Sequence, residues 1–371
     1  MNDASGFFKG IVVQVSAPGR VNLLGEHTDY NDGYVLPVAT PQRTRVDIAL
    51  STDECFHVSS TNLDESATFT ADGELPQGFA RYVAGCMRVL RDHGVQVPPL
   101  AMKVYSEVPM GSGLSSSAAL EVAVLRAVRQ LLDLDLDDVQ IAQYGQAAEI
   151  RYAGVQCGIM DQMAASLADT GHMLFLDTRT LERRVLPMPE DCALIVIDSG
   201  VTRTLATSKY NERFAECRDA ARLLGVPMLR DVTDLTQLAI LPDVLHKRAR
   251  HVVTENARVL AAIAPGVDAT AFGRLMNESH ASLRDDYDVS IQALDTLCAL
   301  LRSEPGVHGA RLTGAGFGGA CVALCEHGRT AAIAAAVTAR YNLDRLLHQA
   351  SVLLPAPPLG MKAEPPQPLF D

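Results

Sequence analysis

Apolar and polar residues follow two patterns along this chain, one typical of strands and the other of helices. Runs that are rich in β-branched residues, or that alternate apolar with polar, predict strands at 11–16, 43–50, 101–108, 173–177, 193–198 and 320–325. Apolar residues at helical spacing predict helices at 115–132, 138–151, 205–224, 246–264, 271–283, 291–303 and 330–341. We expect Asp138 to be the N-cap of the second helix, because Asp accepts hydrogen bonds from free N–H groups.

The order of these elements divides the chain into two blocks. Strands and helices mix in the first block, whereas helices dominate the second until a final strand, glycine loop, strand and helix. The prolines of LPMPED at 186–191 mark a join between the blocks. We therefore expect an α+β fold with an N-terminal domain at 1–190 and a C-terminal domain at 191–345. The proline-rich run at 355–371 is expected to be irregular, and whether the tail at 346–371 returns to the N-terminal domain stays open.

Composition and charge narrow the class of protein. The chain has 371 residues, is 48% hydrophobic and carries a net charge of −12, which fits a large core and excludes a broad nucleic-acid surface. Local phosphate binding stays open, because backbone N–H groups supply it without net positive charge. The eight cysteines form no CxxC pair, and the longest apolar runs are strand-sized. We expect a cytoplasmic protein without nucleic-acid or membrane partners, a monomer with a dimer left open.

A first glycine-rich loop, VPMGSGLSSSAAL at 108–120, lies between a predicted strand and a predicted helix. Gly111 and Gly113 let a ligand approach the backbone closely, and the following serines add hydroxyl donors at a helix N-terminus. Anions bind at such ends, because the N–H groups there are free and the helix dipole is positive. The loop lacks the Lys of a Walker A sequence. A plain serine-rich helix cap is the alternative interpretation.

A second glycine-rich loop, LTGAGFGGACVAL at 312–324, formally contains the GxGxxG pattern of dinucleotide-binding folds. That pattern needs a helix after the loop, whereas a strand is predicted here, so we reject the dinucleotide interpretation. A tight hairpin that needs glycine for positive φ and a loop that closes over a ligand remain as alternatives.

Charged and titratable residues also gather near the N-terminus, in GRVNLLGEHTDY at 19–30. Glu26, His27 and Asp29 are all residue types that bind metals, so the cluster could be a metal site. Carboxylates and imidazole also hydrogen-bond the hydroxyls of a sugar, which both donate and accept.

With these segments the chain resembles the GHMP sugar-kinase superfamily and, within it, the galactokinases. The resemblance rests on the two glycine loops and on APGRVNLLGEHTDYNDGYVLP at 17–37, the most specific of the three. It is extended by CGIMDQMAAS at 157–166 and SKYNERFAEC at 208–217, and covers about 17 to 325. It implies a two-lobed fold, with a mixed-sheet N-terminal domain, a helix-rich C-terminal domain and the active site in the cleft between them.

The resemblance also implies roles for single residues in ATP-dependent, Mg²⁺-dependent phosphorylation of the anomeric hydroxyl of galactose. Asp161 would be the catalytic acid/base, Arg20 would stabilise the transition state, and Ser117 with Glu149 would hold Mg²⁺. The ATP phosphates would lie against Gly111, Ser112, Gly113, Leu114, Ser115, Ser116 and Ser117. The sugar would lie against Glu26, His27, Thr28, Asp29, Gly158 and Tyr210.

These residue types suit that chemistry. Phosphoryl transfer needs reactants to be positioned and spreading charge to be neutralised. A carboxylate beside the attacking hydroxyl can take its proton, an adjacent Arg keeps that carboxylate ionised, and oxygen ligands suit Mg²⁺. Taken singly, each has an ordinary interpretation: Asp161 as a buried structural acid, Glu149 as a solvated helix residue, Tyr210 as a packing residue and Arg20 as an ion-pair partner.

The chain departs from the family pattern in two places. Galactokinases often carry a Trp before a Tyr-Val-x-Gly segment, whereas this chain has FARYVAG at 79–85 and no Trp. Phe79 either offers its ring to the adenine or simply packs. The tail from about 347 also differs from the family's C-terminal strand.

Two alternative functions stay open beside the phosphorylation of galactose. One is a kinase for N-acetylgalactosamine, arabinose or a uronic acid, and the other is a non-catalytic sensor of sugar and ATP.

Overall fold

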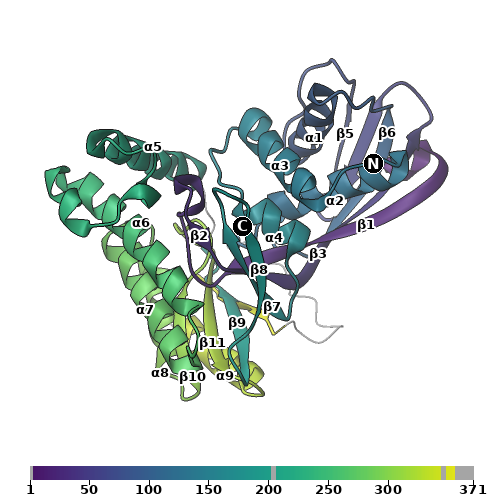
Figure 1. The fold of residues 1–371 in the computed structure, drawn as a ribbon. Helices are drawn as coiled ribbons and strands as arrows, with labels where there is room; N and C mark the ends of the chain where they lie inside the picture. Colours follow the sequence, from purple (N-terminus) through teal and green to yellow (C-terminus); the bar gives the residue numbers. More distant parts are fainter. Residues whose placement is uncertain (1–2, 202–205, 344–347, 356–371) are drawn as a thin grey trace, which may run out of the picture.

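The computed structural model describes residues 3–201, 206–343 and 348–355. The chain folds into two lobes, each built on its own sheet (Figure 1). The predicted α+β class and two-lobed arrangement are confirmed. No helix in these ranges is both long and apolar enough to cross a membrane.

The N-terminal lobe is built on a mixed five-stranded sheet. Its strands, in spatial order, are β1 (Phe8–Asn22), β3 (Pro37–Ser51), β6 (Leu100–Ser106), β4 (Phe56–Ser60) and β5 (Glu65–Phe69). Neighbours are antiparallel except β4 and β6, which run parallel. The helices that cover one face of this sheet are α1 (Ala80–Asp92), α2 (Ser116–Leu132), α3 (Asp138–Ala148) and α4 (Met160–Leu167) (Figure 1). Their apolar residues and those of the sheet form one core.

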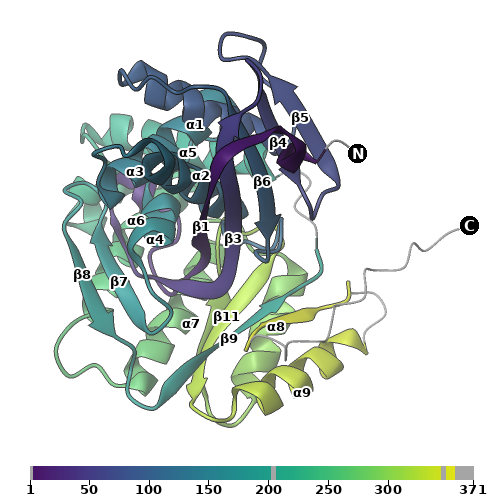
Figure 2. The same cartoon turned by 90° about the vertical axis from the view of Figure 1, so that its right-hand side faces the viewer.

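The C-terminal lobe is built on a four-stranded antiparallel sheet and is rich in helices. Its strands, in spatial order, are β10 (Val307–Leu312), β11 (Ala320–Glu326), β9 (Cys192–Asp198) and β12 (Ser351–Leu354). Its helices are α5 (Ala206–Leu224), α6 (Asp243–Ala262), α7 (Ala269–Asp285), α8 (Gln292–Ser303) and α9 (Thr330–Asn342). Figure 2 shows α9 beside β9 and β12.

A small third sheet contacts both lobes. It consists of β2 (Tyr34–Val35), β7 (His172–Asp177) and β8 (Arg183–Pro187). β7 packs against β3 and α4, whereas β2 packs against α6. A shared apolar core that includes Leu23 and Val322 also joins the strands of the two lobes. The two lobes are therefore held in a defined relation near residues 17–37, the segment that resembles the galactokinases most specifically and is called the sugar signature segment below.

The elements predicted from residue patterns are all found, but one predicted cap is wrong. Asp137, rather than Asp138, caps α3: its Oδ1 accepts hydrogen bonds from Val139 N and Gln140 N, both at 2.8 Å. The Gln140 side chain accepts in return from the Asp137 N–H, completing a capping box. Asp138 instead pairs with Arg129, at 3.0 Å. The predicted helix at 138–151 also changes type, because α3 ends at Ala148 and a π-helical turn, Glu149–Ala153, follows.

Part of the tail segment takes a definite place. β12 pairs with β9 in the C-terminal sheet, and Gln42 of β3 also donates a hydrogen bond to the Leu353 carbonyl at 2.7 Å. Residues 356–371, with the predicted irregular run, lie outside the described residues, as does the first residue of the helix predicted at 205–224. The domain boundaries at 190 and 345 stay predictions. All eight cysteines are free thiols, five of them buried.

Candidate active site

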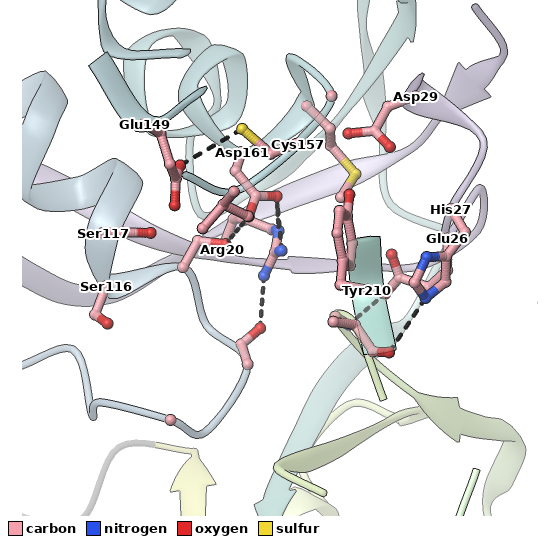
Figure 3. Close-up of a pocket in the computed structure, with 18 of the residues that line it drawn as sticks. Arg20, Glu26, His27, Asp29, Ser116, Ser117, Glu149, Cys157, Asp161 and Tyr210 are labelled. Carbon is pink, nitrogen blue, oxygen red and sulfur yellow. Dashed lines mark hydrogen bonds and ion pairs between the residues drawn. The ribbon is translucent and has the colours of Figure 1, made fainter. Parts of the chain in front are cut away.

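A pocket of about 230 Å³ brings together most of the residues singled out from the sequence (Figure 3). It is formed by the end of β1 and the loop after it, the first glycine loop, the π-helical turn, the start of α4, α5 and the second glycine loop. The predicted site residues that line it are Arg20, Glu26, His27, Asp29, Gly111, Gly113, Ser115, Ser116, Ser117, Glu149, Gly158, Asp161 and Tyr210.

Arg20 and Asp161 form the central ion pair of this pocket. The Nη2 and Nε atoms of Arg20 lie 2.6 Å and 2.8 Å from the same oxygen, Oδ1 of Asp161. The other carboxylate oxygen, Oδ2, accepts a hydrogen bond from the Ser115 hydroxyl. Arg20 is buried, which alone would lower its pKa, but the carboxylates of Asp161, Glu26 and Asp29 outweigh burial and raise that pKa. The guanidinium therefore stays charged beside Asp161.

The same arginine fixes the first glycine loop against β1. Its Nη1 donates to the Gly113 carbonyl at 2.6 Å, and its backbone N–H donates to the Leu114 carbonyl at 3.0 Å. Gly19 permits this close approach, since a Cβ there would lie 2.7 Å from the Leu114 carbonyl oxygen. Gly113 has a φ of +90°, which glycine adopts without strain. The loop ends where α2 begins, so the N–H groups of the first turn of α2, which have no partner within the helix, lie beside the pocket.

Glu149 lies at the start of the π-helical turn, near the serines of the glycine loop (Figure 3). Its Oε2 accepts a hydrogen bond from Gln162 Nε2 at 2.7 Å and lies 3.7 Å from the Cys157 sulfur. Burial, followed by the nearby charge of Asp161, raises the pKa of Glu149 to about 7, against hydrogen bonds from Ser117 and Gln162 that lower it. Ser117 and Glu149 thus offer two oxygen ligands at one edge of the pocket, a donor set that fits Mg²⁺.

On the opposite side, Glu26 is held by several donors. Its Oε2 accepts from Asn22 Nδ2 at 2.8 Å, and its Oε1 accepts from the Gly314 N–H at 2.5 Å. Arg311, which is fully buried, lies 3.5 Å from Oε1. Glu26 therefore ties the sugar signature segment to the second glycine loop.

His27 makes a second tie between the same two loops. A carbonyl only accepts, so Nε2 of His27 carries the hydrogen that is donated to the Ala315 oxygen at 3.2 Å. Burial lowers the pKa of His27 to about 3, so the ring is neutral and Nδ1 accepts from the Tyr30 hydroxyl at 2.9 Å. Tyr30 in turn lies 2.7 Å from the Tyr287 hydroxyl, which lies 3.0 Å from the Cys217 sulfur. This chain of hydrogen bonds fixes the tautomer and occupies both ring nitrogens.

Asp29 lines the pocket with a carboxylate whose Oδ1 accepts a hydrogen bond from the Tyr30 N–H at 3.0 Å. Burial and then the charges of Asp161 and Glu26 raise its pKa to about 7. The carboxylate lies against Gly158, where a Cβ would come within 2.1 Å of it, so only glycine fits. The ring of Tyr210 closes this side, 5.4 Å from the His27 ring between centroids.

Three predicted site residues do not line the pocket with their side chains. The Thr28 hydroxyl lies 2.8 Å from the Gly25 carbonyl and 2.7 Å from the Tyr34 carbonyl, inside the turn. The Ser112 hydroxyl donates to the Pro109 carbonyl within its own loop. The Leu114 side chain is buried in the apolar core that joins the lobes. These three residues shape the loops that carry the others.

The pocket also contains residues that were given no role from the sequence: Tyr82, Val155, Cys157, Met160, Gly314 and Ala315. Most belong to blocks already recognised as family-like, namely FARYVAG, CGIMDQ and LTGAGFGG. Their family-like spacing was the available signal, but it did not show which side chains turn inward. The second glycine loop is now a wall of the pocket, since Gly314 and Ala315 line it.

A second cavity, of about 520 Å³, adjoins the first and shares Tyr82, Ser116 and Ser117 with it. Much of its wall is apolar, with Phe79, Leu63, Val104, Val108, Pro109, Met110 and Leu120. A flat apolar group joined to phosphates would fit here, with the phosphates at the glycine loop between the two cavities.

The signature segment is not a metal centre in the described part of the chain. Residues 3–201, 206–343 and 348–355 contain no group of three or more His, Cys, Asp and Glu side chains placed to hold a metal ion. Glu26 and His27 are instead engaged by the protein, as described above. A cation at Ser117 and Glu149 would take its remaining ligands from phosphates and water.

Three family models match the sequence in the order of these structural parts. The galactokinase galactose-binding signature matches residues 8–50, the GHMP kinases N terminal domain matches 81–169, and the GHMP kinases C terminal domain matches 263–343. The galactokinase of Roseiflexus sp. strain RS-1 is 45% identical over 91% of this chain and 88% of its own length. The galactokinase of Haemophilus influenzae strain PittEE is 42% identical over 89% of both chains.

Solved structures agree with these sequence relatives. The Lactococcus lactis galactokinase complexed with galactose matches with a TM-score of 0.86 and 35% identity, over 92% of each chain. The Methanococcus jannaschii mevalonate kinase, at 16% identity and a TM-score of 0.65, shares the fold over 93% of this chain and 98% of its own. By its matched segments, its relatives and its fold, the chain belongs to the galactokinase family of GHMP kinases and is a sugar kinase.

Proposed function

We propose that this protein transfers the γ-phosphoryl group of ATP to the anomeric hydroxyl of D-galactose, giving α-D-galactose 1-phosphate and ADP. The observation that carries the proposal is the Arg20–Asp161 ion pair, which lies between the first glycine loop and the sugar signature segment in one pocket. The bound galactose of the Lactococcus lactis relative supports the choice of sugar.

In this proposal Asp161 takes the proton of the attacking hydroxyl. Its Oδ1 is held by Arg20 and its Oδ2 by Ser115, so the carboxylate is oriented before substrate binds. Arg20 remains charged through the reaction and can share negative charge as the phosphoryl group moves. Because Arg20 also fixes Gly113 and Leu114, one side chain sets the distance between base and phosphate loop.

The nucleotide would span the two cavities. The phosphates would lie against the backbone N–H groups of residues 111–117 and the hydroxyls of Ser116 and Ser117, at the N-terminus of α2. The base would enter the apolar cavity beside Phe79, which supplies an aromatic ring where the family often has Trp.

Ser117 and Glu149 would hold Mg²⁺ at the phosphates. A cation held there would supply positive charge against the phosphates while the phosphoryl group is transferred. Glu149 must be ionised to bind a cation, and its raised pKa makes that step dependent on pH. A cation site whose remaining ligands are phosphates and water needs few protein ligands, and Ser117 and Glu149 would be the two that this pocket supplies.

The sugar would lie between Asp29, Gly158 and Tyr210. Asp29 lines the pocket with a carboxylate that could accept hydrogen bonds from sugar hydroxyls, although its Oδ1 already accepts one from the Tyr30 N–H at 3.0 Å. Gly158 leaves the space that this carboxylate occupies. Glu26 and His27 hold the wall, through Gly314 and Ala315, against which the ring would pack. The two loops would thus fix the shape of the sugar pocket.

The pocket's charge bears on the alternative sugars. Among the described residues that line it, Arg20 is the single Arg or Lys, and it is already paired with Asp161, while Glu26, Asp29 and Glu149 add further carboxylates. A uronic acid would bring another negative charge against them, so neutral sugars are favoured. The intact glycine loop and the oriented Asp161 also favour an enzyme over a non-catalytic sensor.

Phosphorus NMR of a reaction that contains galactose, ATP and Mg²⁺ tests this proposal. We expect a sugar-phosphate signal that is coupled to the anomeric proton and that grows in step with ADP. Phosphate on any other sugar carbon, or ADP formed with free phosphate alone, would contradict it.

A further inference from the structure

Glu121 is a carboxylic acid inside the apolar core of the N-terminal lobe. It lies on α2, among neighbours such as Val122 and Leu125 that belong to that core, and its exposed fraction is 0%. Acidic side chains are rarely buried completely without a partner. No ion pair found among the described residues includes Glu121, so it is not there to neutralise an arginine or lysine.

Within residues 3–201, 206–343 and 348–355, the one side chain that hydrogen-bonds the Glu121 side chain is Gln162, which is equally buried. Gln162 Nε2 donates to Glu121 Oε2 at 3.0 Å and to Glu149 Oε2 at 2.7 Å. An amide nitrogen carries two hydrogens, so each carboxyl receives one. Gln162 therefore bridges Glu121, deep in the core, to Glu149 at the pocket. It also directly follows Asp161 in α4.

Two oxygen atoms of this bridge remain without a hydrogen-bond partner among the described residues: Glu121 Oε1 and Gln162 Oε1. They are both acceptors as long as Glu121 is ionised. A proton on Glu121 would make one of them a donor, as in a paired acid and amide. Burial raises the pKa of Glu121 well above its ordinary value, and the charge of Glu149 raises it further. The uncharged acid is the form that suits this place.

We propose that Glu121 and Gln162 act as a positioning pair that aims Glu149 at the cation site. The inference rests on the proposed function, in which Glu149 binds Mg²⁺. Gln162 engages Glu149 Oε2, so Oε1 would be the oxygen that meets the cation. Glu121 in turn holds the side-chain amide of Gln162, which lies in the same turn of α4 as Asp161. The orientation of the metal ligand and that of the base are thereby linked through adjacent residues.

A purely structural role explains this arrangement poorly. A leucine or methionine at position 121 would fill the core without burying Glu121 Oε1, which has no hydrogen-bond partner among the described residues. A buried polar atom left unpaired costs about 1–3 kcal/mol. Residues that hydrogen-bond a metal ligand orient it, and their removal lowers metal affinity by about 10–100-fold. Such a role would explain why a destabilising buried carboxyl is kept at position 121.

The test compares Glu121→Leu and Glu121→Gln with the unmodified protein. The probe is Mn²⁺, whose binding in the presence of a non-hydrolysable ATP analogue is followed by electron paramagnetic resonance, alongside calorimetric galactose affinity and thermal unfolding. We expect Glu121→Leu to weaken Mn²⁺ binding by about 10–100-fold with galactose affinity unchanged. Glu121→Gln, which keeps the acceptor and supplies an amide donor to Gln162, should restore it to within about threefold of the unmodified protein.

Val122→Ala is the matched control, because Val122 is a fully buried neighbour of Glu121 on α2 whose side chain has no polar atom to hydrogen-bond Gln162. It should lower the unfolding temperature without changing Mn²⁺ affinity. Gln162→Met is the second variant, to be used if Glu121→Leu does not fold. It removes the bridging amide itself and should weaken Mn²⁺ binding as strongly. Unchanged Mn²⁺ affinity in Glu121→Leu or Gln162→Met, or no recovery in Glu121→Gln, would overturn the positioning role. Absence of nucleotide-dependent Mn²⁺ binding in the unmodified protein would instead overturn the proposed function.

Discussion

Arg20 and Asp161 are separated by 141 positions in the chain, yet Arg20 Nη2 lies 2.6 Å from Asp161 Oδ1. The pair joins the end of β1 to the start of α4, and Arg20 also fixes the glycine loop that lies between them. In the proposed mechanism, one side chain would therefore position the base, the charge stabiliser and the phosphate loop.

Asp161→Asn should lower kcat by about 10²–10⁴-fold, because the amide cannot take the proton of the attacking hydroxyl. Galactose and nucleotide affinity should change little, since the side chain keeps its shape. Coupled ADP-release kinetics and calorimetry measure the two effects. Near-normal turnover in this variant would contradict the assigned base. Arg20→Lys is the companion variant: it keeps the charge but loses the fork that reaches both Asp161 and Gly113, so kcat should fall as well.

Asp29→Asn should stabilise the sugar-free protein at pH 8 while abolishing galactose binding. The folded state holds the Asp29 proton up to a pKa of about 7, whereas the ordinary value is 3.8. The free energy of unfolding therefore declines as the pH rises from 3.8 to about 7, and above about 7 the full loss of stability is reached. We expect a gain of about 1–2 kcal/mol at pH 8, below what the full pKa shift implies because Asp29 is only half-buried.

The same variant at pH 4 provides the control for that prediction. There Asp29 is protonated in the folded protein and the substitution should leave the unfolding midpoint nearly unchanged. An equal gain at both pH values would show that the raised pKa of Asp29 is not its cause. Urea unfolding at the two pH values gives both numbers.

Divalent-cation affinity should fall as the pH is lowered below about 7, because a proton and the cation compete for Glu149. The apparent Kd for Mn²⁺ in the presence of an ATP analogue should approach about a tenfold rise per pH unit below that value. Glu149→Gln should bind the cation weakly and with a much flatter pH dependence, after correction for the analogue's own protonation. A pH-independent Kd in the unmodified protein would exclude Glu149 as the ligand.

Tyr30→Phe should raise the KM for galactose while leaving the KM for ATP unchanged. The substitution removes the hydroxyl that donates to His27 Nδ1, and a buried acceptor left unpaired costs about 1–3 kcal/mol. The tie from His27 to the Ala315 carbonyl then loses its fixed tautomer. Nitrogen NMR of labelled histidine reports the tautomer directly. Tyr105→Phe, at an exposed position, is the matched control.

Phe79→Ala should raise the KM for ATP by roughly tenfold, because stacking of an aromatic ring on a base contributes about 1–3 kcal/mol. The galactose KM should be unaffected, since Phe79 lies in the second cavity and not in the first. Leu235→Ala, an exposed apolar residue of the other lobe, serves as the control. An unchanged KM for ATP would place the base elsewhere.

The sequence predicts much of this account because its motifs are local. The loops around Gly111 and Gly314, and the segment that carries Glu26 and Asp29, are recognisable within about a dozen residues each, and the helix or strand beside each follows from its spacing. The α3 cap was misplaced by one residue because two adjacent aspartates offer equal chemistry, and only the backbone geometry selects Asp137.

Other features depend on partners that are distant in sequence. The tautomer of His27 is set through Tyr30 by Tyr287, which is 257 positions from Tyr30, and no local pattern specifies that contact. Glu121 is hidden for a related reason: helical spacing shows a helix but not that both of its faces are buried. The inward turn of Tyr82 likewise follows from how α1 packs, which the sequence does not express.

The central claim is that galactose is the sugar phosphorylated, and a monosaccharide panel tests it most directly. The measurement is kcat/KM from ADP release with galactose, N-acetylgalactosamine, arabinose and galacturonate at saturating ATP and Mg²⁺. We expect galactose to exceed each of the others by at least about tenfold, a difference of about 1.4 kcal/mol in transition-state binding. A higher value for another sugar, or sugar-independent ADP release, would contradict the claim.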